Sequence, residues 1–160
     1  MMRKLKLYLD TSVINFIYAD DAPEYKAVTL DFFENYLDSY EVYISEIVLL
    51  EIERTTDLNR KTLLRSTIEK YGLDVYNEVN KEIEELADKY IKHRLIPQKK
   101  YDDALHVAFC TYYEFDILLS WNFGHLANIM KQTRINAFNE SEGYSKRLNL
   151  INPMVVIYEK

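Results

Sequence analysis

The stretch that most constrains the fold is a short apolar run that ends on an aspartate. Residues 5–9 carry leucine at positions 5, 7 and 9 and tyrosine at position 8, and Asp10 follows directly. Near-continuous apolarity over so few residues is typical of a parallel strand that is covered on both faces. Open α/β sheets bind ligands at the carboxyl ends of their strands, so Asp10 is a candidate site residue. Alternatively, Asp10 only caps the helix that follows, for which Thr11 and Ser12 are themselves favourable caps.

Length and composition fit one domain that covers residues 1–160. A chain with 48% apolar residues is long enough to bury a core, and its 3 glycines and 3 prolines argue against linkers and disorder. Cys110 is the only cysteine, which excludes an internal disulfide and fits a reducing compartment. The basic start is followed by too short an apolar run for a signal peptide or a membrane span. We therefore expect a cytoplasmic protein that makes no contact with a membrane.

Strand and helix patterns alternate along the chain. Short buried strands are predicted at 42–44 and 117–119, residues 73–76 are compatible with another, and residues 151–158 are predicted as a last strand with Pro153 at its start or on an edge. Helices are predicted at 24–39, 46–54, 60–70, 80–93 and from 101 onward. This alternation predicts βαβ units with right-handed crossovers and a parallel sheet.

Glu51 stands out because its helical neighbours are apolar. Ile47 and Val48 lie four and three residues before it, so the three side chains share one face of the predicted helix. A carboxylate among buried residues must be paired, hydrogen-bonded or bound to a metal ion. Pairing with a nearby arginine or lysine is the alternative to a functional role.

A second helix opens with two aspartates, Asp102 and Asp103. Acid in a first helical turn normally compensates the helix dipole. This role accounts well for one of the two aspartates and less well for the second. His106 lies three residues after Asp103 and is within reach of it, although a histidine on an apolar face is more often a packed core residue than a ligand. Ser120 and Asn122 stand at the carboxyl end of the strand at 117–119, so two predicted strands end in polar groups.

Taken in order, these motifs resemble those of the PIN-domain ribonucleases, which include the VapC-type toxins of toxin–antitoxin pairs. Leu9-Asp10-Thr11-Ser12 is similar to their opening L-D-T-S, and Ser45 with Glu51 to their S-x-x-x-x-x-E. Asp103 to Ala108 matches D-A-L-H-x-A, and Ser120-Trp121-Asn122 matches the final T/S-W/x-D/N element. The resemblance spans residues 5–126.

The resemblance implies a three-layer α/β/α domain with a central five-stranded parallel sheet. It also implies an acidic pocket that holds Mg²⁺ or Mn²⁺ and hydrolyses single-stranded RNA. Asp10, Glu51 and Asp103 are then the catalytic residues, and they bind the metal together with Asn122. Thr11, Ser12, Ser120 and His106 support the site. A metal-activated water does not need the RNA 2′-hydroxyl, so the expected products carry a 5′-phosphate and a 3′-hydroxyl. A homodimer and a small antitoxin partner are further implications.

Asn122 is a departure, because many family members have a fourth acidic residue at this position. The remaining set contributes at most three negative charges, which favours one metal ion over two and leaves weak or absent activity open. A non-catalytic RNA- or partner-binding module with the same fold is therefore the alternative function. Other hydrolase and nucleotide-binding motifs are missing: the chain has no Gly-rich phosphate loop, no G-x-S-x-G and no H-E-x-x-H.

The net charge of -6 does not suggest a strong non-specific nucleic-acid binder. Basic residues nevertheless flank Asp103 and Asn122 in the sequence. We predict that RNA enters over Lys92, Arg94, Lys99, Lys100 and Lys131. The alternative is that these charges only form a solvated surface.

Overall fold

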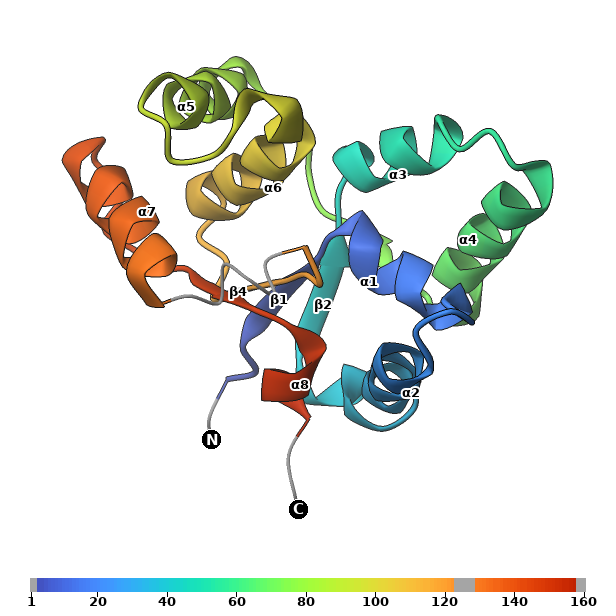
Figure 1. Ribbon diagram of the computed structural model, residues 1–160. Helices are drawn as coiled ribbons and strands as arrows, with labels where there is room; N and C mark the ends of the chain where they lie inside the picture. The colour runs from blue at the N-terminus through green and yellow to red at the C-terminus, as the bar shows by residue number, and fades with distance from the viewer. Residues whose placement is uncertain (1–2, 123–128, 158–160) are drawn as a thin grey trace.

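Five short strands form one parallel sheet with β1 at its centre (Figure 1). The strands are β1 (Lys6–Leu9), β2 (Glu41–Ile44), β3 (Asp74–Val75), β4 (Ile117–Leu119) and β5 (Asn149–Ile151). Their order across the sheet is β3-β2-β1-β4-β5, and all neighbours are parallel. The computed structural model describes residues 3–122 and 129–157, so residues 123–126 of the predicted motif span lie outside the described residues.

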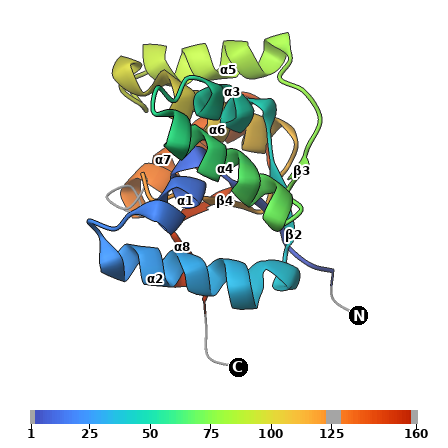
Figure 2. The same cartoon turned by 90° about the vertical axis from the view of Figure 1, so that its right-hand side faces the viewer.

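Helices cover both sides of the sheet, which confirms the predicted three-layer α/β/α architecture. The helices are α1 (Thr11–Asn15), α2 (Pro23–Asp31), α3 (Glu46–Glu53), α4 (Leu58–Lys70), α5 (Lys81–Lys92), α6 (Tyr101–Tyr112), α7 (Ile129–Ser141) and α8 (Pro153–Val156). Short turns of other helix types occupy Phe16–Tyr18, Phe32–Tyr36, Leu37–Ser39 and Gln98–Lys100. Figures 1 and 2 show α5, α6 and α7 together on one side of the sheet, and α1, α2 and α4 on the other.

The central strand is buried on both faces, as its apolar sequence predicts. Leu7, Tyr8 and Leu9 have no exposed surface, and the Tyr8 ring packs against Phe109 and Phe115 at centroid distances of 5.4 and 5.7 Å. Burial of one large apolar side chain contributes about 1.5–3 kcal/mol. The register pairs Leu9 with Leu119, so β1 and β4 end at the same level of the sheet. The residues that follow the two strands, Asp10 and Ser120, therefore meet at the carboxyl edge of the sheet.

The helix starts follow local capping chemistry, with one correction to the sequence analysis. Thr11 and Ser12 do not cap α1; Asp10 itself is the N-cap, with extended backbone and a side chain that accepts from the Ser12 amide. The reason is that the cap must precede the first helical residue, and Thr11 is already helical. Ser45 caps α3, and its hydroxyl accepts from the Ile47 amide at 3.1 Å. The α4 helix ends before Gly72, whose φ of 58° is the left-handed conformation that glycine tolerates best.

The prediction of a strand at 151–158 is wrong. The strand β5 ends at Ile151, and the chain then forms α8, with Pro153 in its first turn. Asn152 stops the strand because its side chain accepts from the Met154 amide at 2.9 Å, and the fixed φ of Pro153 suits the first turn of a helix. Residue 158 lies outside the part of the chain that the structure describes.

The helix α7 was not predicted from the sequence, and it covers the edge strand of the sheet. The Asn136 side chain donates to the Leu148 carbonyl and accepts from the Leu148 amide, both at 2.9 Å, while Gln132 accepts from the Leu150 amide at 2.8 Å. These bonds satisfy backbone groups at an edge that would otherwise be open to another strand. Among the described residues, no helix has the length and apolar character that crossing a membrane requires.

Candidate active site

Asp10 lies at the carboxyl edge of the sheet and is 1% exposed. Its Oδ1 accepts from the Ser12 amide at 3.0 Å and from the Ser12 hydroxyl at 2.5 Å, and its Oδ2 accepts from the Ser120 hydroxyl. Burial raises the pKa of Asp10 to about 6, against the opposing effects of the His106 charge and the two serine hydroxyls. No described residue forms an ion pair with Asp10. The chain therefore buries a carboxylate among neutral donors.

Glu51 is held by residues from two other helices, α1 and α6. Its Oε1 accepts from the Thr11 hydroxyl at 2.9 Å and contacts His106 Nε2 at 2.5 Å, and its side chain is 24% exposed. Burial would raise the pKa of Glu51, but the hydrogen bond and charge of His106, together with the Thr11 hydrogen bond and the Arg54 charge, outweigh that effect and lower it. The expected alternative, a pair with a nearby arginine or lysine, is replaced by a pair with a histidine 55 residues away.

Behind Glu51, a chain of buried hydrogen bonds continues into the core. His106 Nδ1 lies 2.6 Å from the Tyr8 hydroxyl, which lies 2.6 Å from the Ser45 hydroxyl, and Ser45 accepts from the Ile47 amide. Burial would lower the pKa of His106, but Glu51, Asp10 and Asp103 together raise it above its usual value. His106 does not bond Asp103, the partner three residues away that the sequence suggested; it orients Glu51 instead.

Asp103 lies on the other side of the edge, on α6, and is half-buried. Its Oδ1 accepts from the Asn122 amide nitrogen at 3.3 Å. Burial raises the pKa of Asp103, and His106, Asn122 and Lys100 only partly offset this effect. The adjacent Asp102 is separate from the site, because it pairs with Arg54 at 3.1 Å.

Hydrogen bonds connect Asp10 to Asp103 through the end of β4. The Ser120 hydroxyl donates to Asp10 and accepts from the Asn122 amide at 3.0 Å, and the Asn122 side chain donates to Asp103. The charges also interact: Asp103 raises the pKa of Asp10, and Glu51 raises that of Asp103. The three acids thus share one edge of the fold, although no three described histidine, cysteine, aspartate or glutamate side chains converge closely enough to hold a metal ion by themselves.

The donor set of this edge fits a hard divalent cation. Its available ligands are carboxylate, hydroxyl and amide oxygens, without a thiolate. Mg²⁺ usually binds one or two carboxylates and keeps several of its waters, so it does not require three converging side chains. A buried carboxylate such as Asp10, whose hydrogen-bond donors are all neutral, is also the kind of group that a metal ion stabilises.

Two of the basic residues predicted to bind RNA lie near the acids. Lys100 lowers the pKa of Asp103, and the pKa of Lys131 is lowered by burial and by the charges of Lys100 and Arg134. Arg134, which was not among the residues predicted to bind RNA, belongs to this basic cluster and follows Lys131 by three positions in α7. Among the described residues, Lys92, Arg94 and Lys99 form no hydrogen bond or ion pair with Asp10, Glu51 or Asp103.

The opposite end of the sheet carries an unrelated acidic group. Asp116 precedes β4 and accepts from the Arg3 guanidinium at 2.9 Å, from Lys146 at 2.6 Å and from the Lys6 amide at 2.8 Å. Despite burial, these partners hold the pKa of Asp116 well below its usual range. Its ion pairs are complete, so Asp116 does not replace the missing fourth acid.

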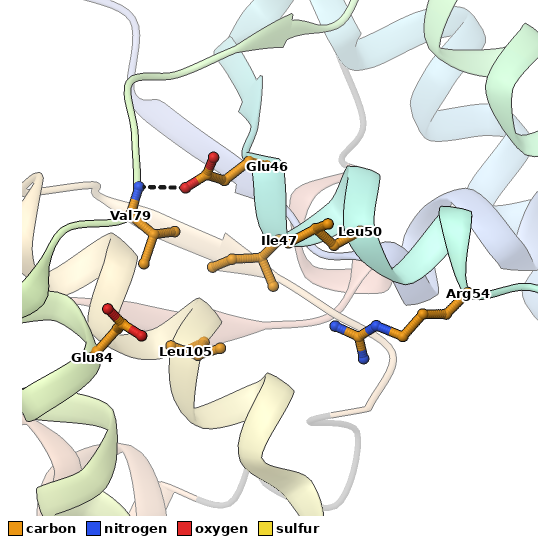
Figure 3. Close-up of a pocket in the computed structure, with 7 residues that line it drawn as sticks. All are labelled: Glu46, Ile47, Leu50, Arg54, Val79, Glu84 and Leu105. Atoms are coloured by element: carbon orange, nitrogen blue, oxygen red, sulfur yellow. Dashed lines mark hydrogen bonds between the residues drawn. The ribbon is translucent and has the colours of Figure 1, made fainter.

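A pocket of about 300 Å³ opens between α3, α5 and α6 (Figure 3). Ile47, Leu50 and Leu105 give it an apolar lining, while the Arg54 side chain borders one end. Glu46 accepts from the Val79 amide at 2.8 Å and so holds the chain before α5 against α3. Leu50 is 55% exposed, which leaves an apolar surface at the mouth of this pocket.

Comparison with known proteins adds one family to this geometry. Searches of curated proteins and of solved structures found no match. A family model described as the PIN domain matches residues 7–122, which include the strand before Asp10 and extend to Asn122. PIN domains bind nucleic acids and are generally metal-dependent nucleases, so this match indicates a nuclease-type function. Because the match covers well over half of its length, the chain belongs to the PIN-domain family.

Proposed function

We propose that the protein is a metal-dependent endoribonuclease that hydrolyses single-stranded RNA at the edge formed by Asp10, Glu51 and Asp103. The observation that carries this proposal is the environment of Asp10. It is a buried carboxylate whose partners among the described residues are neutral hydroxyl and amide groups, and it is coupled to Asp103 through Ser120 and Asn122. A bound Mg²⁺ or Mn²⁺ would supply a water of lowered pKa and would neutralise charge on the phosphate.

The opposite pKa directions of the other two acids divide their roles. Glu51, whose pKa is lowered, stays ionised and serves as a ligand that Thr11 and His106 orient. Asp103, whose pKa is raised, is the better proton acceptor of the two. Asn122 would contribute a neutral oxygen. Lys100 and Lys131 would contact the phosphates of the strand beside Asp103.

The experiment is a cleavage assay on a pool of end-labelled single-stranded RNA with Mg²⁺ or Mn²⁺. The wild type should produce ends with 5′-phosphate and 3′-hydroxyl groups, and a chelator should stop the reaction. Asp103→Asn should lower the rate by about 100-fold or more, the size of effect typical of general base removal. Asp102→Asn is the matched control on the adjacent position, because Asp102 pairs with Arg54 outside the site, and it should cut at the wild-type rate.

A non-catalytic binding module is the second candidate. Asn122 favours it, since this residue supplies no charge where many family members have an acid, and the described acids do not converge into a preformed metal cluster. A protein that binds RNA but releases no product with either metal, in both wild-type and Asn122→Asp forms, would establish this candidate in place of the nuclease.

We further propose that the nuclease is the toxin of a toxin–antitoxin pair and acts as a homodimer. The apolar pocket at α3, α5 and α6 supports a protein partner, because Leu50 leaves it partly uncovered. Induced expression should arrest growth of a bacterial host, and the Asp103→Asn variant should not. Light scattering at high protein concentration should give the mass of a dimer; a monomer mass would contradict that part of the proposal.

A further inference from the structure

Three aromatic rings, those of Phe16, Tyr25 and Trp121, gather beside the Asp10 side of the site. The Trp121 ring lies 5.5 Å from Phe16 and 4.8 Å from Tyr25, measured between ring centroids. The backbone amide of Trp121 donates to the Ser12 hydroxyl at 2.9 Å, the same hydroxyl that donates to Asp10. Its indole nitrogen donates to Thr29 of α2, also at 2.9 Å. The ring cluster is therefore fixed directly to the catalytic edge.

Tyr25 stands at the outer end of this cluster and is 43% exposed. Beside it lies a hollow of about 340 Å³, which we call the Tyr25 hollow, lined by Asp21, Ala22, Pro23, Glu24 and Tyr25. No described residue donates a hydrogen bond to the carboxylate of Asp21 or of Glu24. The nearby Lys26 is occupied by Asp20, with which it forms an ion pair. The hollow thus combines an aromatic wall with two carboxylates that have no partner among the described residues.

We propose that the Tyr25 hollow binds a nucleobase of the RNA strand whose backbone lies at Asp10. This inference rests on the proposed function and adds a base subsite to it. A base is the fitting part of the strand, because aromatic rings stack on any base whereas two carboxylates repel a phosphate. The phosphates would then lie beside Asp103, with whose charge Lys100 and Lys131 interact.

The two carboxylates also predict which base is preferred. Asp and Glu side chains accept hydrogen bonds from amino groups of bases, such as the N4 amino group of cytosine. Cytosine, adenine and guanine each carry an amino group, whereas uracil has none. The hollow should therefore favour an amino-bearing base over uracil at the position that stacks on Tyr25.

Fluorescence provides a direct test, because Trp121 is the only tryptophan of the chain. Titration with oligocytidine and oligouridine of six nucleotides, in the presence of chelator, should quench Trp121, and oligocytidine should bind at least about fivefold more tightly. Tyr25→Leu should weaken oligocytidine binding by about tenfold, since it removes the stacking ring. Tyr25→Phe, which keeps the ring, should bind like the wild type and show that position 25 tolerates change.

Two further variants distinguish failure of the base subsite from failure of the proposed nuclease function. The double variant Asp21→Asn with Glu24→Gln should remove the preference for cytosine, and Leu58→Ala, at an exposed position of α4, should change nothing. Equal binding of both oligonucleotides by the wild type, or unchanged binding by a folded Tyr25→Leu variant, would overturn the base subsite even if the protein cuts RNA. Quenching with the predicted preference but without cleavage in Mn²⁺ would preserve the subsite and refute the nuclease.

Discussion

Asp10 combines a structural and a chemical role in one side chain. As the N-cap of α1 it accepts from the Ser12 amide, and as the residue after β1 it presents a buried carboxyl group beside Ser120. Because the folded environment favours the protonated form, the folded state binds a proton more tightly than the unfolded chain. In the absence of metal, Asp10 therefore stabilises the protein least when it is ionised.

This property predicts the pH dependence of Asp10→Asn. The pKa of Asp10 is raised from 3.8 to about 6, so wild-type stability should fall as pH rises through this window. Asparagine also caps helices and carries no charge. In chelator at pH 8, Asp10→Asn should match or exceed the wild type in free energy of unfolding, with a gain of up to about 3 kcal/mol. Urea denaturation at pH 4 and pH 8 measures the difference; a variant destabilised equally at both pH values would contradict it.

Asn122 allows a complementary prediction. Asn122→Asp removes the amide that donates to Asp103 and adds a negative charge beside it. Without metal the variant should therefore unfold at a lower temperature, because like charges meet at a half-buried position. With Mn²⁺ it should gain more thermal stability than the wild type and cut RNA faster. Calorimetry with and without Mn²⁺ measures the two unfolding temperatures, and the RNA cleavage assay measures the rate. An equal metal-induced shift of the unfolding temperature in the two proteins would argue against Asn122 as a ligand.

At the scale of single elements, α3 is oriented through its first turn. Ser45 caps this helix and also bonds Tyr8, which bonds His106, which in turn holds Glu51 on the same helix. The start of α3 and its functional residue are thus connected by a closed path of side chains through β1 and α6. An N-cap in such a position influences the site as well as the helix.

Ser45→Ala should accordingly lower the free energy of unfolding by more than the loss of an ordinary N-cap does. We expect about 2 kcal/mol of unfolding free energy, the sum of about 1 for the cap and about 1 for the bond to Tyr8. Asp57→Ala, the cap of α4 at an exposed position, is the matched control and should cost about 1 kcal/mol. Only Ser45→Ala should also reduce RNA cleavage. If the two variants lose equal stability and neither loses activity, Ser45 does not influence Glu51.

Across the whole molecule, the charge distribution matters more than its sum. The chain has a net charge of -6, yet Lys131 interacts with the charges of Lys100, Arg134 and Asp103, and Lys100 interacts with Asp103 as well. A local positive field of this kind can attract a phosphate backbone to an acidic protein. The partial burial of Lys131 beside the like charges of Lys100 and Arg134 strengthens this attraction, since a bound phosphate would relieve the repulsion between these side chains.

The double variant Lys100→Glu with Lys131→Glu should weaken RNA binding and flatten its salt dependence. Each phosphate contact to a single strand contributes about 0.7 to the slope of log K against log salt, so the loss of two should reduce the slope by about 1.4. Lys70→Glu, in the last turn of α4, is a control that makes the same substitution at one position outside the site and half of the charge change. Affinity measured between low and moderate salt provides the slope; an unchanged slope would place the RNA elsewhere.

The sequence determined the local features of this protein. The apolar runs specified the central strands, Ser45 specified the start of α3, and the alternation of strands and helices specified the parallel sheet. These features depend on neighbours within a few residues, so they can be read without a structure. The helix at Pro153 is the exception, because its cap and proline were readable signals that the apolar residues after them obscured.

Only the tertiary structure decided how the acids are supported. The bond from Ser120 to Asp10 depends on the register of β1 with β4, and the contact of His106 with Glu51 depends on the packing of α6 against α3. Tyr8, predicted only as a strand residue, became part of the path to Glu51 for the same reason. The partners in these bonds are separated by 55 to 110 residues, and periodicity along one element contains no information about which face of a distant element it will meet.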